Sequence, residues 1–132
     1  MRTRMTALAI VIAALGGASI AEAHSTTYRT TSSFAFGAVP EAALGFINDG
    51  VGNQDCRKGR IVKLYRVRSG RDLLLGRDRS GTPVGNGDGH WTVHANLGNA
   101  RYYARIKQKN IGTGAHRHIC RAYRTSTLRY HP

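Results

Sequence analysis

Residues 101–109 read RYYARIKQK, and the alternation within this stretch decides the fold class. Its apolar positions occupy one face of a strand: Tyr102, Ala104 and Ile106. The other face holds a second tyrosine and three cations: Tyr103, Arg105, Lys107 and Lys109. Because successive side chains on a β-strand point to opposite faces, we predict that the first set is buried and the second faces solvent. A slip of one residue would expose the apolar set, so the register is strongly specified.

Similar short stretches, rich in Val, Ile, Tyr and Thr, occur on both sides of this strand and are separated by Gly, Asn and Ser. No helical period interrupts them, which favours antiparallel strands joined by turns. Further strands are predicted over residues 28–36, 60–68, 73–77, 90–94 and 119–130. Residues 42–47 are compatible with either a strand or a short helical turn. We therefore predict an all-β fold, an antiparallel two-sheet sandwich of about seven strands.

The first 23 residues have the pattern of a secretory signal peptide. Arg2 and Arg4 precede an apolar run over residues 7–15, and residues 21–23 (AEA) form a small-residue cleavage site. An uncleaved anchor is the alternative, but the run is too short to span a bilayer. We expect no transmembrane segment after cleavage, and a single domain over residues 24–132 that is secreted or held in the cell envelope.

Two cysteines, Cys56 and Cys120, remain in this exported chain. An even number of cysteines in an oxidising compartment predicts a disulfide. A disulfide between them would close a loop of about 64 residues, which in the chain-entropy model stabilises the folded state by about 4 kcal/mol. Two buried free thiols are the alternative.

Several motifs occur in a familiar order: residues 59–66 (GRIVKLYR), 76–77 (GR), 88–93 (DGHWTV) and 102–106 (YYARI). In this order the chain resembles secreted bacterial β-sandwich modules of the carboxypeptidase-regulatory, transthyretin-like (Ig-like) type. The resemblance covers residues 56–129. It implies a sandwich in which a cysteine before the first motif pairs with one in the closing strand, as Cys56 and Cys120 would. It also implies a binding, spacer or surface-presentation role, with no catalytic residues.

The composition predicts anionic partners. Residues 24–132 contain 18 lysines and arginines against six acidic residues, a net charge of +12. Such a surface attracts an anionic polymer, the cell-envelope surface or nucleic acid, although the charge could serve solubility alone. Cations contact phosphates or carboxylates while aromatic rings stack on bases or sugars. The predicted contact residues are Tyr103, Arg105, Lys107, Lys109, Arg117, Arg121 and Arg124.

Histidines suggest a second function, copper or zinc binding. Candidate ligands are His24, His90, His94, His116 and His118. In residues 116–124 (HRHICRAYR), Cys120 shares a face with two of these histidines, but a disulfide would remove its thiolate. Cleavage after Ala23 would make His24 the first residue, so that its α-amine and ring could chelate copper with a second imidazole. That arrangement resembles copper-carrying secreted β-sandwiches and copper-dependent polysaccharide oxygenases.

A small secreted nuclease is a third alternative, since two histidines and an arginine could perform acid–base cleavage of a phosphodiester. The motifs G-x-S-x-G and H-E-x-x-H do not occur, and Glu41 is the only glutamate after residue 23. We therefore expect an exported, non-catalytic surface or binding module that requires no cofactor.

Overall fold

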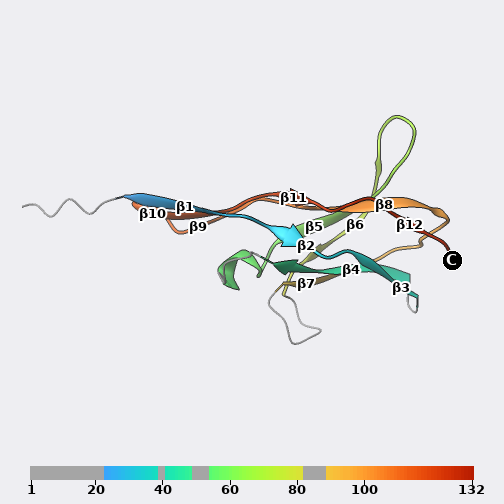
Figure 1. Cartoon of the computed structure of the whole chain (residues 1–132), viewed down its shortest axis with the longest axis horizontal. Helices are drawn as coiled ribbons and strands as arrows, with labels where there is room; N and C mark the ends of the chain where they lie inside the picture. Colours follow the sequence, from blue (N-terminus) through green and yellow to red (C-terminus); the bar gives the residue numbers. More distant parts are fainter. Residues whose placement is uncertain (1–22, 39–40, 49–53, 82–88) are drawn as a thin grey trace, which may run out of the picture.

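The computed structural model describes residues 23–38, 41–48, 54–81 and 89–132, and this part of the chain is all β apart from one 3₁₀ turn, η1 (Gln54–Cys56). The predicted signal peptide lies outside the described residues except for Ala23. The described residues form twelve strands (Figure 1). They are β1 (His24–Tyr28), β2 (Thr31–Ser32), β3 (Ala35–Ala38), β4 (Glu41–Asn48), β5 (Ile61–Arg66), β6 (Leu73–Arg79), β7 (His90–His94), β8 (Ala100–Ile106), β9 (Lys109–Ile111), β10 (His116–Cys120), β11 (Tyr123–Arg124) and β12 (Leu128–Tyr130).

These strands form three sheets. The first has the order β1-β10-β9, with β1 parallel to β10, and it lies at one end of the long axis of the molecule (Figure 1). The second has the order β11-β8-β5-β6, with β12 also paired to β8. In the third, β4 lies between β2 and β3 and also pairs with β7. The five-stranded and four-stranded sheets enclose the core.

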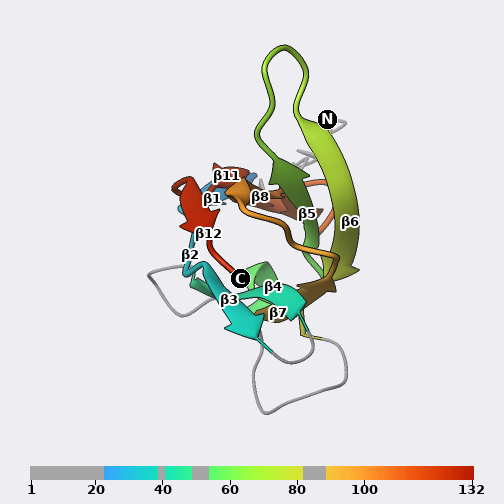
Figure 2. The same cartoon turned by 90° about the vertical axis from the view of Figure 1, so that its right-hand side faces the viewer.

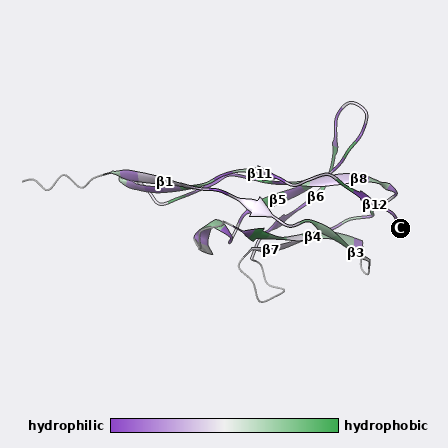
Figure 3. Cartoon of the chain, in the orientation of Figure 1, coloured by the Kyte–Doolittle hydropathy of each residue, from purple (hydrophilic) through white to green (hydrophobic). Residues whose placement is uncertain are grey.

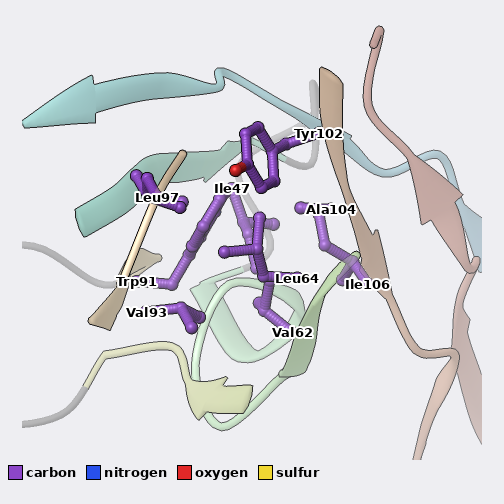
Figure 4. Close-up of a cluster of buried hydrophobic side chains, with 10 residues drawn as sticks. Ile47, Val62, Leu64, Trp91, Val93, Leu97, Tyr102, Ala104 and Ile106 are labelled. Atoms are coloured by element: carbon purple, nitrogen blue, oxygen red, sulfur yellow. The ribbon is translucent and has the colours of Figure 1, made fainter. Parts of the chain in front are cut away.

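The core consists of the inward faces of β4, β5, β7 and β8. Tyr102, Ala104 and Ile106 are at most 1% exposed, which confirms the predicted buried face of β8. Figure 4 shows the core side chains pointing toward one another: Ile47, Val62, Leu64, Trp91, Val93, Leu97, Tyr102, Ala104 and Ile106. Each large apolar side chain buried in this way contributes about 1.5–3 kcal/mol to folding. The hydropathy of the strands follows their position: β4, in the core, is largely hydrophobic, while β11, at the edge of the five-stranded sheet, is hydrophilic (Figure 3).

The prediction of an all-β fold is confirmed, but the predicted seven strands and two sheets are wrong. Residues 101–109 are not one strand, because β8 ends at Ile106 and the chain re-enters a different sheet as β9 at Lys109. Residues 28–36 and 119–130 are divided among several strands in the same way. The alternation ends with β8, because Gln108 occupies the next position of the apolar set and is exposed. Residues 42–47 belong to β4, which resolves that segment as a strand.

The predicted disulfide is present and joins Cys56 in η1 to Cys120 at the end of β10. Both cysteines are completely buried, and no described cysteine is free. The bridge connects the three-stranded sheet to the start of β5. At the other end of β5, the hairpin to β6 protrudes from the molecule (Figure 2). In the described part of the chain, no helix is long and apolar enough to cross a membrane.

Candidate functional site

A groove of about 770 Å³ lies where β5, the end of β8 and β11 meet. We call it the basic groove. Its charged lining residues are all cationic: Arg60, Lys63, Arg105, Lys107, Lys109 and Arg124. Two tyrosines, Tyr65 and Tyr123, also line it. Neither a carboxylate nor a histidine is among these lining residues. The Asp72 carboxylate, which does not line the groove, interacts electrostatically with Arg105 and Arg124.

Strand register places four cations side by side on the outer face of the five-stranded sheet. Lys63 on β5 lies opposite Arg77 on β6 and opposite Arg105 on β8, and Arg105 lies opposite Arg124 on β11. Residues directly opposite in antiparallel strands share a face. With strands about 4.8 Å apart, this row of four spans about 14 Å. We call Arg77, Lys63, Arg105 and Arg124 the cationic row. Like charges directly opposite one another destabilise a sheet, so the row lowers the stability of the fold.

Tyr103 lies on the outer face of β8, as predicted, but it is only 5% exposed. The ring of Tyr65 on β5 stacks against it at a centroid distance of 5.3 Å, and Arg124 on β11 places its guanidinium 3.8 Å from the ring centroid. Because β5 and β11 flank β8 on opposite sides, both sides of the Tyr103 ring are covered. The prediction that Tyr103 faces solvent is therefore wrong, while its role as a ligand contact stays a prediction. Its ring orients Arg124.

The hydroxyl of Tyr103 donates a hydrogen bond to Asp72 Oδ2 at 2.8 Å, and the backbone N–H of Arg68 donates to Asp72 Oδ1 at 3.1 Å. These two hydrogen bonds, the first above all, lower the pKa of Asp72 below 3.8. Burial and the bond to Asp72 raise the pKa of Tyr103 above 10.0. Asp72 thus anchors the tyrosine from the base of the β5–β6 hairpin.

Arg60 lies at one wall of the groove and is 1% exposed. Its guanidinium donates to Thr30 Oγ1 at 3.1 Å and to the Cys56 carbonyl at 2.8 Å. It also donates twice to the Lys107 carbonyl, at 2.8 and 3.1 Å, and to the Arg121 carbonyl at 2.7 Å. Burial lowers the pKa of Arg60 from 12.5 to about 10, which leaves it cationic at neutral pH.

Sequence reasoning did not single out Arg60, although a signal was present. Arg60 falls two residues before Val62 and four before Leu64, so the alternation of β5 places it on the buried face. A buried arginine must be hydrogen-bonded, and its five donors suit a site where several backbone carbonyls converge. Here those carbonyls come from segments adjoining both ends of the disulfide.

The remaining predicted cations are only partly in the groove. Lys109 lines it, but from β9, and its Nζ donates to the carbonyls of Asp55 at 2.9 Å and Lys58 at 2.8 Å. Burial lowers the pKa of Lys109. Arg117 and Arg121 are exposed and do not line the groove. Of the seven predicted contact residues, the structure brings Arg105, Lys107, Lys109 and Arg124 together.

The predicted histidine ligands are divided between two sheets. The parallel pairing of β1 with β10 places His24 opposite His116, and their Nδ1 atoms are 3.1 Å apart. The ring of His118 is 6.2 Å from that of His24. His90 and His94 are exposed on β7, in the four-stranded sheet. Within the described residues, no group of three or more His, Cys, Asp or Glu side chains is arranged to hold a metal ion.

Comparison with known proteins leaves the family open. The chain matches no protein-family model, no curated protein and no solved structure. The resemblance to transthyretin-like modules therefore stays a prediction that rests on the sequence motifs alone.

Proposed function

We propose that this chain is an exported, non-catalytic binding module that holds an anionic polymer in the basic groove, and that its sheets form a sandwich of the Ig-like, transthyretin-like type. The cationic row is the observation that supports this function most directly. Four cations at adjacent cross-strand positions lower the stability of the sheet, and a ligand with closely spaced negative groups would relieve their repulsion.

The chemistry of the row suits phosphate, sulfate or carboxylate groups. Arginine presents planar donors that match these anions in a bidentate manner, while lysine contributes a point charge. Arg124 is already oriented by its contact with Tyr103, so less side-chain entropy is lost when it binds. Tyr65 and Tyr123 line the same groove and offer apolar surface to sugar or base rings.

An extended polymer fits better than a single small anion. The row spans about 14 Å, so one monomer of a polymer would reach only part of it. A cell-envelope polysaccharide and a single-stranded nucleic acid both meet this description, because both repeat negative groups along a chain. The lining lacks the histidine or carboxylate that acid–base cleavage of such a polymer would use, which supports binding without hydrolysis.

The experiment compares two double variants of equal net charge. Lys63→Gln with Arg105→Gln removes the centre of the cationic row. Arg29→Gln with Arg101→Gln removes two exposed cations outside the groove. Binding of fluorescent heparin and of single-stranded DNA is measured by anisotropy at several salt concentrations. The relative affinities of the two probes distinguish a polysaccharide from a nucleic acid.

We expect the row variant to weaken binding roughly ten-fold and to reduce the slope of log K against log salt by about 2, one for each lost contact. The control variant should change affinity by less than about two-fold. Equal weakening in both variants would show that net charge alone attracts the polymer, and the proposed groove would then be wrong.

A further inference from the structure

His24 and His116 meet where β1 and β10 begin, at the end of the molecule farthest from the β5–β6 hairpin (Figure 1). Their rings are 4.5 Å apart, centroid to centroid, and their Nδ1 atoms face each other at 3.1 Å. Both side chains are exposed, so an ion in solution can reach them. The two histidines are 92 residues apart in the chain, and only the parallel pairing brings them together.

The separation of the two nitrogens suits a single metal ion. Two imidazole nitrogens that bind one ion at about 2.05 Å lie about 2.9 Å apart at a right angle and about 3.3 Å apart in a tetrahedral site. The observed 3.1 Å falls between these values. Without a metal, the pair can form one hydrogen bond in which one Nδ1 donates and the other accepts.

The face on which the pair lies favours a cation in spite of the high positive charge of the chain. Residues at alternate positions share a face, so His118 lies on the face of His116 and Arg117 on the opposite face. Opposite His118 stands Thr26, and the ring of Tyr28 lies 5.6 Å from the ring of His118. His118 Nδ1 is buried. The face therefore contains three imidazoles beside neutral neighbours, and Lys109, opposite Cys120 on the same face, directs its Nζ to the carbonyls of Asp55 and Lys58.

We propose that His24 and His116 form a copper(II) site, and that the α-amine of His24 becomes the third ligand once the chain is cleaved after Ala23. Imidazole and amine nitrogens bind Cu²⁺ more tightly than the other divalent first-row metals. In the uncleaved chain the backbone nitrogen of His24 is an amide that donates to the Ala115 carbonyl at 2.8 Å. Cleavage turns that nitrogen into an amine on the same residue as the first imidazole, which creates a chelate. This site is separate from the basic groove and does not depend on the polymer proposal.

The test uses exported protein whose start at His24 is verified by mass spectrometry. Cu²⁺ is titrated calorimetrically in the presence of glycine as a competing chelator, and electron paramagnetic resonance reports the nitrogen ligands. Three further proteins are compared: His116→Gln, the matched control His94→Gln, and the processed chain with its α-amine acetylated. Melting curves of the metal-free proteins check that each variant is folded, which is expected because both histidines are exposed.

We expect one Cu²⁺ per chain with nitrogen hyperfine structure in the processed protein. His116→Gln and the acetylated chain should each bind at least about ten-fold more weakly, and His94→Gln should bind like the parent. The site is disproved if His116→Gln retains the parent affinity or if His94→Gln weakens binding equally. Parent-like affinity in the acetylated chain would show that the α-amine is not a ligand, and would overturn the proposed three-nitrogen site.

Discussion

Replacement of Arg60 by methionine tests how much of the fold depends on one buried guanidinium. Methionine is also long and unbranched, but it donates no hydrogen bond. The change would leave the carbonyls of Cys56, Lys107 and Arg121 without the donor that Arg60 now supplies. These carbonyls belong to three segments that meet beside the disulfide, so the loss affects how the three-stranded sheet joins the rest of the molecule.

The expected magnitude follows from the contacts. Arg60 has four distinct partners within 3.1 Å. The carbonyls of Cys56, Lys107 and Arg121 would each lose a donor, at a cost of at least about 1 kcal/mol per unsatisfied buried acceptor. The predicted loss in the free energy of unfolding is therefore about 3 kcal/mol, which agrees with the cost of breaking other buried polar contacts of a charged group.

Guanidinium chloride denaturation of the oxidised protein measures this loss. At a slope of about 3 kcal/mol per molar, the midpoint should fall by about 1 M. Arg60→Lys separates charge from geometry, because an ammonium cannot reach the partners on both sides of the guanidinium. It should destabilise the protein nearly as much as methionine does. Arg101→Met, at an exposed position on β8 outside the cationic row, is the matched control and should change stability by less than about 0.5 kcal/mol.

Two outcomes would refute this reasoning. If Arg60→Met unfolds within about 1 kcal/mol of the parent, the hydrogen bonds and the burial cost cancel, and Arg60 does not stabilise the fold. If Arg60→Lys matches the parent while Arg60→Met does not, a buried positive charge is sufficient and the fork of donors is not required.

Two further predictions concern the core and the tyrosine beside the groove. Gly45→Ala should lower the free energy of unfolding by about 1–3 kcal/mol, because an added Cβ would clash with the Ser33 carbonyl oxygen and lie 2.6 Å from Trp91 Cζ2. Gly98→Ala, where the added Cβ meets no atom within 4 Å, should be tolerated. Thermal melting of both variants tests this, and equal melting temperatures would contradict it. Asp72→Asn should lower the pKa of Tyr103, which an ultraviolet absorbance titration measures, since the carboxylate now stabilises the neutral hydroxyl. In the parent, the pKa of Asp72 is lowered, so its contribution to stability is complete above pH 3.8 and is lost as the pH falls through the folded-state pKa; Asp72→Asn should remove this acid-side decline.

Local alternation predicts burial in this chain but not sheet membership. Tyr102, Ala104 and Ile106 are buried as their spacing indicates, because a strand with one apolar face must cover that face. The end of β8 is marked in the sequence, because the polar residues 107–110 (KQKN) interrupt the apolar positions, but nothing local indicates that β9 joins a different sheet. Pairing depends on partners far away in the sequence, which local alternation does not report. The structure has more and shorter strands than predicted for the same reason, because alternation alone does not show which partner each segment pairs with.

The residues of the candidate sites also differ in whether the sequence could predict them. The positions of Arg105 and Lys107 follow from the alternation of residues 101–109, and both line the groove. The cationic row and the contact between His24 and His116 depend on the register of distant strands, which composition does not encode. The burial of Tyr103 also has a long-range cause, since its neighbours on β5 and β11 cover a ring that would be exposed on an isolated strand.

Structural and binding roles meet at Arg60, and this affects how any loss of binding is interpreted. Arg60 lines the groove while its guanidinium is occupied by carbonyls, including that of Lys107. A variant of Arg60 would displace the backbone that presents the Lys107 ammonium, so weaker binding would not show that Arg60 contacts the polymer. Lys107 is different, because its backbone carbonyl serves Arg60 while its exposed side chain lines the groove. A change of the Lys107 side chain keeps the carbonyl, and it therefore alters the charge of the groove without removing the contacts that hold the fold together.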